Sequence, residues 1–172
     1  MSIPQFKSGS GPREPHYLTR AGARRMQDEL VELRTKQRPK IVTDVADAAA
    51  QGDRSENAEY IYGKKKLREI DRRIIYLTKR LETATVVGPA DREGSATDRV
   101  FFSAIVEVED DDGKETTYQI VGADEIDLAR GLISYRSPLG RALLKRQVGD
   151  TVVFHKPSGE AELTIVSIRY EP

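Results

Sequence analysis

The sequence has no cysteine and no tryptophan, and its two histidines, His16 and His155, lie far apart in the chain. A disulfide framework and a thiolate metal site are therefore excluded, and a histidine zinc site is not expected. No apolar run approaches the roughly 20 residues that a membrane-spanning helix needs. The N-terminus also lacks a basic segment followed by an apolar stretch, which would mark an export signal. We therefore expect a cytoplasmic protein with no membrane partner.

Apolar residues are scarce and charged residues are abundant. They make up 38% and 33% of the 172 residues, whereas typical globular domains have about 45–50% and about 25%. This composition predicts a thin, solvent-exposed element in place of a single large core. Residues 1–90 carry 18 basic and 12 acidic residues, and residues 91–172 carry 10 and 16. A basic half joined to an acidic half indicates two surfaces, one of which can contact a polyanion.

Residues 1–16 are rich in Gly, Pro and Ser, and we expect them to form a disordered tail. Thr19 then provides an N-cap for a helix whose apolar residues recur at spacings of three and four. Pro39 predicts a kink, beyond which the apolar pattern resumes about one residue out of phase. Gly52 lies where the C-cap of this helix is expected. The apolar positions are Ala23, Met26, Leu30 and Leu33 before the kink, and Ile41, Val45 and Ala48 after it.

A second helix is predicted to start near Asp53–Ser55 and to end at about Ala84. Two sets of residues spaced seven apart form its apolar seam, as in a coiled coil. They are Tyr60, Leu67, Ile74 and Leu81, and Gly63, Ile70, Leu77 and Ala84. Two such helices joined by a short turn predict an antiparallel coiled-coil hairpin over residues 17–85, roughly 45 Å long at about 1.5 Å per residue.

A Gly/Pro/Asp-rich linker is expected over residues 86–99, and beyond it the apolar period falls to two. Strands are predicted at Val100–Glu109, Thr116–Val121, Val152–Phe154 and Leu163–Arg169, with a short helix at Pro138–Arg146. Residues 100–172 are therefore predicted to form a small domain with an antiparallel sheet. The whole chain belongs to the α+β class, with a helical hairpin followed by this sheet domain.

The predicted turn of the hairpin carries two acids, Asp53 and Glu56, three residues apart at a helix start. Their carboxylates share one face of the helix and can meet. One interpretation is a capping box, with Asp53 as the N-cap and Glu56 at N3. The other is a partial Mg²⁺ site that a second molecule completes, because Mg²⁺ usually takes only one or two carboxylates from a protein. The two interpretations are compatible.

The second helix also carries a basic stripe. Its members are Lys64, Lys65, Lys66, Arg68, Arg72, Arg73, Lys79 and Arg80. Only Glu69, Asp71 and Glu82 are acidic in this part of the helix, so the stripe is under-neutralised. It is either a solvated face with intrahelical ion pairs or a groove for single-stranded nucleic acid, with Tyr60 and Tyr62 near one end for stacking.

The stretch from Gly52 to Tyr60, the helix from Lys64 to Leu81 and the segment from Ser137 to Leu144 resemble the bacterial transcript cleavage factors GreA and GreB. The resemblance covers about residues 17–171. The segment LREIDRR, residues 67–73, and the dense basic stripe are more similar to GreB than to GreA.

The resemblance implies a C-terminal domain of the FKBP-like fold and a monomeric protein whose partner is RNA polymerase. It implies that the hairpin enters the polymerase secondary channel, where Asp53 and Glu56 help to hold a catalytic Mg²⁺ shared with the polymerase, and no stably bound cofactor otherwise. The basic stripe would guide the 3′ end of the backtracked nascent RNA. Ser134, Ser137 and Pro138 would contact the polymerase. The chain would then be an accessory factor and not an enzyme.

Three other functions are weighed against this one. A channel-binding regulator without a cleavage role is expected to differ at the two acids, and both are present here. A free-standing metal-dependent nuclease needs more converging acidic or histidine ligands than one helix end offers. A plain coiled-coil adaptor is the remaining alternative. Three features depart from the family pattern. Arg136 stands where some relatives have an acidic residue before the Ser-Pro pair. The 16-residue leader and the longer linker around Gly94–Asp98 are the other two.

Overall fold

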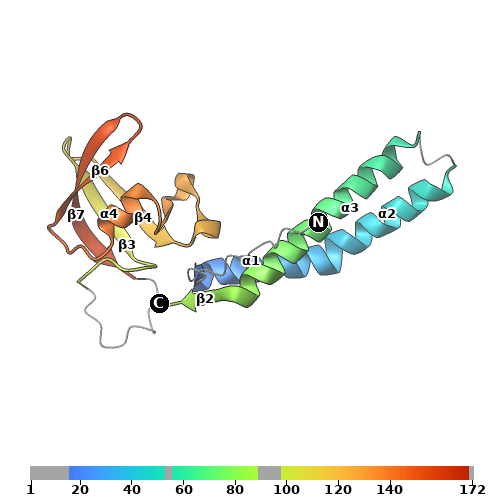
Figure 1. The fold of residues 1–172 in the computed structure, drawn as a ribbon, viewed down its shortest axis with the longest axis horizontal. Coiled ribbons are helices and arrows are strands. Elements are labelled where there is room, and N and C mark those ends of the chain that lie inside the picture. Colours follow the sequence, from blue (N-terminus) through green and yellow to red (C-terminus); the bar gives the residue numbers. More distant parts are fainter. Residues whose placement is uncertain (1–15, 53–55, 89–97, 171–172) are drawn as a thin grey trace, which may run out of the picture.

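The chain is described by a computed structural model that covers residues 16–52, 56–88 and 98–170. A long helical hairpin extends from a C-terminal sheet domain, so the fold is α+β as predicted (Figure 1). Among the described residues, none of the helices combines the length and apolar character needed to cross a membrane.

The first leg of the hairpin consists of α1 (Arg20–Glu32), a π-helical turn η1 (Leu33–Gln37) and α2 (Arg38–Ala50). Thr19 caps α1 as predicted, because its hydroxyl accepts a hydrogen bond of 2.9 Å from the Gly22 amide. In η1, the Arg38 amide donates to the Leu33 carbonyl five residues earlier. A π turn holds one residue more than an α turn needs. It therefore explains the predicted phase shift and places it in η1, ahead of Pro39, which stands in the first turn of α2.

The second leg is α3 (Ala58–Thr83), whose N-cap is Asn57. The Asn57 Oδ1 accepts hydrogen bonds from the amides of Glu59 and Tyr60, and its Nδ2 donates to the Ala48 carbonyl at 2.9 Å. The predicted start near residues 53–55 is therefore corrected to Ala58. Glu56 precedes the N-cap and is not at N3, so the capping-box interpretation is wrong. The 26 residues of α3 span about 39 Å.

The two legs pack along the predicted seam. The buried apolar residues of this core are Leu18, Met26, Leu30, Leu33, Ile70 and Leu77. Gly63 allows a close approach nearer the turn, because a Cβ added there would lie 2.6 Å from Val45 Cγ2. The core is a single line of contacts, which accounts for the low apolar content of the sequence.

A two-stranded parallel sheet closes the base of the hairpin. It pairs β1 (His16–Thr19) with β2 (Ala84–Val87), and His16 is opposite Ala84. His16 therefore belongs to a strand and not to the predicted tail, and residues 84–87 form a strand and not a helix end and linker. Neither strand was predicted. The rest of the predicted tail and most of the predicted linker, residues 89–97, lie outside the described residues.

The C-terminal domain contains a five-stranded sheet in the order β5-β4-β3-β7-β6. The strands are β3 (Ile105–Asp110), β4 (Glu115–Val121), β5 (Leu132–Ser134), β6 (Thr151–Lys156) and β7 (Gly159–Arg169). All neighbours are antiparallel except β4 and β5. The first predicted strand begins five residues later than expected, because residues 101–104 form a turn that leads into β3. Helix α4 (Pro138–Leu143) packs against β6 and β5.

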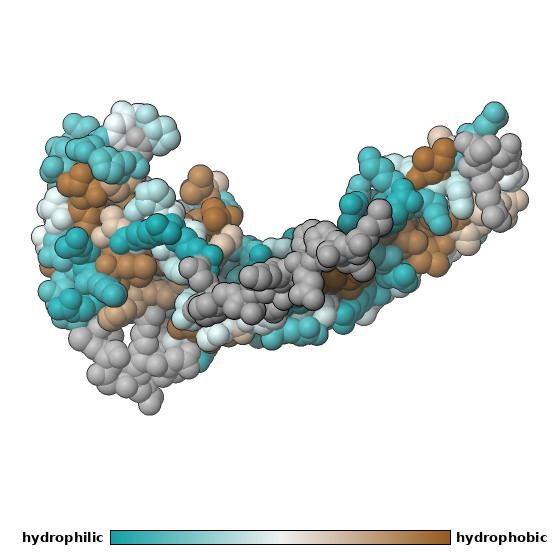
Figure 2. Space-filling model, viewed as in Figure 1, coloured by the Kyte–Doolittle hydropathy of each residue, from teal (hydrophilic) through white to brown (hydrophobic). Residues whose placement is uncertain are grey.

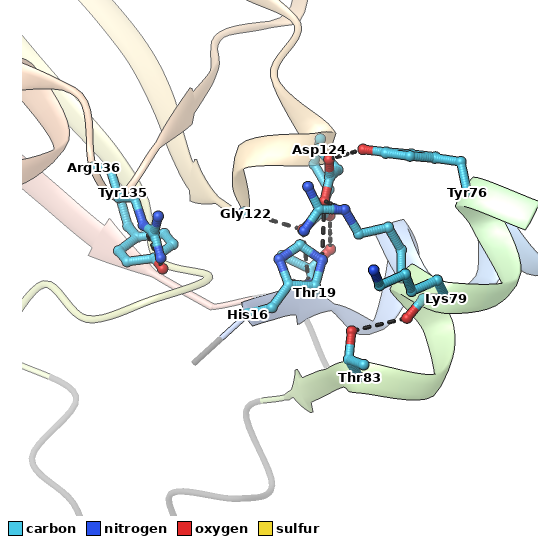
Figure 3. A network of polar contacts seen from close by, with 11 residues as sticks. His16, Thr19, Tyr76, Lys79, Thr83, Gly122, Asp124, Tyr135 and Arg136 are labelled. Atoms are coloured by element: carbon cyan, nitrogen blue, oxygen red, sulfur yellow. Dashed lines mark hydrogen bonds and ion pairs between the residues drawn. The ribbon is translucent and has the colours of Figure 1, made fainter. Parts of the chain in front are cut away.

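Two adjacent acids attach this domain to the base of the hairpin (Figure 3). Glu125 is buried and accepts hydrogen bonds from the Thr19 amide at 2.9 Å, from the Thr19 hydroxyl and from the Gly122 amide at 3.1 Å. Asp124 accepts a hydrogen bond from the Tyr76 hydroxyl, and its Oδ2 lies 2.9 Å from His16 Nε2. Both acids lie in or beside the short 3₁₀ turn η3 (Ala123–Glu125), so one turn holds the two parts of the molecule together.

An aromatic cluster supports the same contact. The rings of Tyr17, Phe102 and Tyr135 have centroids 5.7–5.8 Å apart. Tyr17 comes from the hairpin base and the other two from the C-terminal domain. Edge-to-face pairs at this separation are favourable beyond the apolar area they bury.

Candidate functional site: the turn and the basic face of the hairpin

The turn between α2 and α3 is at the end of the hairpin farthest from the C-terminal domain (Figure 1). Gly52 follows the end of α2 and has a φ of +128°, a conformation that favours glycine. Glu56 is exposed in the turn just before Asn57, and it makes no ion pair with any described residue. Asp53, the other predicted metal ligand, lies outside the described residues, as does Ser55. One predicted acid is therefore at the end of the hairpin and open to solvent.

The described part of the predicted metal site is a single carboxylate, that of Glu56. Among the residues that the structure describes, no group of three or more His, Cys, Asp or Glu side chains lies close enough to hold a metal ion. A carboxylate such as Glu56 is a hard oxygen ligand of the kind Mg²⁺ prefers. Glu56 could therefore serve as one ligand of a Mg²⁺ ion whose remaining ligands come from elsewhere.

The structure divides the basic stripe into two rows along α3. Lys65, Arg72 and Lys79, seven residues apart, form what we call the outer row, and they make no ion pair with any described residue. Lys64 and Arg68 are likewise exposed and unpaired within the described part of the chain. The paired row consists of Lys66, Arg73 and Arg80, and each of its members faces a carboxylate. Only the Lys66 contact is an intrahelical ion pair, because Arg73 and Arg80 face carboxylates on other elements. Nucleic-acid binding by the outer row stays a prediction.

Arg73 makes the best-formed ion pair in the paired row. Its Nε and Nη2 donate to the two carboxylate oxygens of Glu29 on α1, at 2.7 and 2.8 Å. This fork-to-carboxylate geometry is among the stronger charge-assisted contacts. The hydrogen bonds from Arg73 lower the pKa of Glu29, and the Glu29 carboxylate raises the pKa of Arg73. Arg73 therefore joins the two legs of the hairpin, and its predicted role in RNA binding stays a prediction.

Arg80 and Tyr76 belong to the contact between the hairpin and the C-terminal domain. Arg80 Nε lies 3.5 Å from Asp124 Oδ2, and its guanidinium carbon is 5.2 Å from the centroid of the Tyr76 ring. Burial and the hydrogen bond to Asp124 together raise the pKa of the Tyr76 hydroxyl. Lys66 is closer to the turn, 3.8 Å from Glu69 on its own helix.

The outer row ends in a groove at the base of α3. The groove has a volume of about 460 Å³ and is lined by Arg72, Ile75, Tyr76, Lys79, Arg80 and Thr83. Ile75 is 66% exposed beside two cations of the outer row. Figure 2 shows a broad hollow between the hairpin and the C-terminal domain. Basic groups and an apolar floor in one groove suit a chain that carries both phosphates and bases.

The predicted polymerase contacts lie at the end of β5 and the start of α4. Ser137 is the N-cap of α4, its hydroxyl accepting from the Gly140 amide at 3.0 Å and donating to the Ser134 carbonyl at 2.7 Å. Pro138 is exposed in the first turn. Ser134 is buried, so it can influence docking only by shaping this turn. Arg136 is exposed and stacks on Tyr135, with its guanidinium carbon 5.2 Å from the ring centroid.

Sequence reasoning missed the residues that join the two parts of the molecule. The signal that could have found them is Gly22, a helix breaker in an otherwise regular helix. A Cβ at Gly22 would lie 1.8 Å from Glu125 Oε1, and a Cβ at Gly122 would lie 2.2 Å from the Tyr17 carbonyl oxygen. Both glycines are explained by the close approach of the C-terminal domain.

Comparison with known proteins finds sequence matches over both parts of the chain. The family model "Transcription elongation factor, N-terminal" matches residues 16–86, and "Transcription elongation factor, GreA/GreB, C-term" matches residues 95–170. The chain is 54% identical over 155 residues to transcription elongation factor GreB of Neisseria meningitidis serogroup B, covering 90% of this chain and 94% of that protein. It is 50% identical over 157 residues to GreB of Pseudomonas aeruginosa, with 90% of each chain covered.

Among solved structures, the chain is similar to GreA factor homolog 1 (Gfh1) of Thermus thermophilus, with a TM-score of 0.41 and 26% identity over 90% of this chain and 99% of that one. The two family matches together span both the hairpin and the sheet domain. The chain therefore belongs to the GreA/GreB family of transcription elongation factors and, within that family, is most like GreB.

Proposed function

We propose that this elongation factor stimulates RNA polymerase to cleave the extruded 3′ end of a backtracked transcript. In this proposal the hairpin enters the secondary channel of the polymerase and brings the Glu56 carboxylate, with Asp53, to the polymerase active site. The observation that carries the proposal is the exposed Glu56 at the far end of the hairpin, in the turn that precedes α3, a helix about 39 Å long that carries the outer row.

Glu56 and Asp53 would hold a Mg²⁺ ion together with ligands from the polymerase. When bound, the ion stabilises the charge on the attacking and leaving oxygens of an in-line displacement. The chain's own contribution is to position the carboxylates. Asn57 fixes the turn, because it caps α3 and also bonds to the Ala48 carbonyl at the end of α2. Each ~1.4 kcal/mol of added transition-state stabilisation corresponds to about tenfold in rate.

The outer row would hold the displaced RNA strand. Lys65, Arg72 and Lys79 repeat about every 10.5 Å along α3, since seven residues rise about 1.5 Å each. Cations at this spacing can follow a phosphate backbone, and neutralising phosphates makes the contact sensitive to salt. Pro138 and Ser137 would contact the polymerase at the channel entrance, as the family resemblance implies.

A transcript cleavage assay tests the proposal. Elongation complexes stalled in a backtracked register are incubated with Mg²⁺ and with the parent protein, the Asp53→Asn variant or the Glu56→Gln variant. We expect rapid cleavage with the parent, and loss of the stimulation with either variant while polymerase binding is retained. The factor alone on naked RNA is the control and should give no cleavage. Equal stimulation by the parent and both variants would refute the metal role of the two acids.

A regulator that binds the same channel without promoting cleavage is the second candidate. The same assay separates the two functions, because such a regulator would bind the polymerase and change elongation rates but leave backtracked complexes uncleaved. The exposed Glu56 favours the cleavage factor, because a pure blocker needs no carboxylate at the end of the hairpin.

A further inference from the structure

The groove at the base of α3 contains an exposed apolar side chain that the proposed function does not use. Ile75 lines this groove and is 66% exposed. Its neighbours Ile74 and Leu77 pack in the core between the two legs of the hairpin, and Ile75 does not. A branched apolar residue is also not favoured at a solvent-facing helix position. The stability of the hairpin therefore does not account for Ile75, and its surroundings decide what it can do.

Ile75 is part of a pattern that occurs twice on α3. Ile-Tyr at residues 61–62 is followed by Lys65, and Ile-Tyr at residues 75–76 is followed by Lys79. The two copies are two heptads apart, about 21 Å along the helix, so both isoleucines lie on the face of the outer row. Ile61 is 53% exposed. The outer face of α3 therefore combines cations with apolar side chains at a regular spacing.

The Tyr76 ring forms a fixed wall of the groove. Its hydroxyl donates a hydrogen bond to Asp124 of the C-terminal domain (Figure 3). The guanidinium carbons of Arg73 and Arg80 lie 5.3 and 5.2 Å from the centroid of the ring. Because these contacts already hold the ring in place, a ligand does not have to order it. Two cations already interact with the Tyr76 ring, so Ile75 is the apolar surface of the groove that is open to a ligand.

The groove also presents positive charge without a compensating carboxylate. Its cations Arg72 and Lys79 belong to the outer row and make no ion pair with any described residue. No acidic side chain is among the described residues that line the groove. The two cations are one heptad apart, about 10.5 Å, and Ile75 lies between them in the sequence. This arrangement suits a chain whose anionic groups are separated by an apolar group.

Single-stranded RNA has this composition. Its phosphates are linked through nucleotides whose bases can pack against side chains, which is how proteins commonly bind unpaired strands. An RNA duplex would place phosphates on the cations but keep its bases stacked inside, which would leave Ile75 without a contact. The outer row runs along α3 from the end near the turn to the groove, so a strand that follows these cations reaches Ile75.

We infer that the groove at the base of α3 binds one nucleobase of the extruded RNA, with Ile75 against the base and Arg72 and Lys79 at the flanking phosphates. This inference rests on the proposed function. Ile75 lies about 26 Å along the helix from Ala58, the first residue of α3. Only a transcript that is extruded far enough can make the contact. Ile75 therefore favours action on long extruded RNA.

Substitution of Ile75 tests the inference. Ile75→Thr removes apolar surface but keeps a branched side chain. Val31→Thr is the matched control, because Val31 is 48% exposed on α1 and does not line the groove. With long extruded RNA, the factor concentration for half-maximal cleavage should rise about fivefold for Ile75→Thr and stay at the parent value for Val31→Thr. With RNA too short to reach the groove, all three proteins should act alike. An unchanged concentration for Ile75→Thr on long RNA would overturn the inference.

An abasic nucleotide separates the base contact from the phosphate contacts. It is placed in turn at each position of the extruded RNA, where it keeps the phosphate and removes one base. We expect one position at which the parent loses about fivefold and Ile75→Thr loses nothing further, because its contact is already absent. Ile75→Tyr should strengthen action on the unmodified long RNA, since a base stacks well on an aromatic ring. An equal response of parent and variant at every position would show that only phosphates are bound.

The same measurements distinguish a polymerase side chain in the groove from RNA. If Ile75→Thr weakened action equally on short and long extruded RNA, with an unchanged melting temperature, the groove would contact the polymerase and the inference would be wrong. An equal loss together with a lower melting temperature would assign Ile75 a structural role and contradict it as well. The proposed function fails separately, because the parent protein would then not stimulate cleavage of any backtracked complex.

Discussion

Neutralising the outer row tests whether the unpaired cations on α3 guide RNA. The change is Lys65→Gln, Arg72→Gln and Lys79→Gln in one protein. Each phosphate contact on a single strand contributes about 0.7 to the slope of log affinity against log salt, so losing three lowers the slope by about 2. The ratio of the parent's affinity to the variant's affinity should therefore fall about 20-fold when the salt concentration rises from roughly 50 to 200 mM.

The paired row supplies a control of equal charge. Lys66→Gln, Arg73→Gln and Arg80→Gln also remove three positive charges, but these side chains already face Glu69, Glu29 and Asp124. This variant should change the salt slope by less than about 1 while lowering the melting temperature.

The assay measures the factor concentration that gives half-maximal cleavage of deeply backtracked complexes, over a series of salt concentrations. The proposed docking of the C-terminal domain contributes equally to the parent and the outer-row variant, so the difference between their slopes isolates the outer-row charges. Equal slope changes for the two triple variants would refute the division into rows. No change for either would show that the stripe is only solvated.

Three further predictions concern stability. Asn57→Ala removes the N-cap of α3 and its hydrogen bond to α2. The free energy of unfolding should fall by about 1 kcal/mol, and the melting temperature in a calorimetric scan by about 2–4 °C. An unchanged melting temperature would contradict the stabilising role of the cap. Gly22→Ala places a methyl group against Glu125. The clash should increase the separation of the hairpin and the sheet domain, which small-angle scattering measures. An unchanged scattering profile would show that the contact tolerates the methyl group. Arg73 lowers the pKa of Glu29, so the contribution of the ionised Glu29 to stability is present above the ordinary carboxyl pKa and is lost as the pH falls through the lowered pKa. The Glu29→Gln variant should therefore lose less stability than the parent between roughly pH 5 and pH 3, as measured by urea unfolding. Identical pH profiles for the two proteins would contradict this role of Glu29.

The hairpin could be predicted from the sequence because its signals are local and periodic. Thr19, the seam through Ile70 and Leu77, and the phase shift before Pro39 each depend on residues within two turns of one another, and the structure confirms all of them. The start of α3 could not be fixed in the same way. Asp53, Ser55 and Asn57 are all good N-cap residues, and the choice of Asn57 depends on its additional bond to α2, which is a tertiary contact.

The sheet at the hairpin base and the division of the basic stripe depend on contacts between distant parts of the chain. Residues 16–19 pair with residues 84–87 in parallel, which no turn signal announces. The sequence pattern groups Lys66, Arg73 and Arg80 with the other cations of the stripe but does not show which acids they meet. Glu29 and Asp124 are 44 residues from the cations they bind. The exposed acid at the turn, by contrast, follows from the hairpin topology alone.

The extra residue in η1 has an effect far from where it lies. Beyond Gln37, every side chain of α2 takes the orientation that an uninterrupted helix would give to its neighbour, a turn of about 100° around the axis. Asp44 and Asp47 therefore lie on the side of α2 that lines a shallow groove with Tyr62 of α3 only because Leu33–Gln37 is wound more widely. Deleting one residue there would leave the composition of the hairpin almost unchanged and yet point its distal half at a different part of any channel it enters.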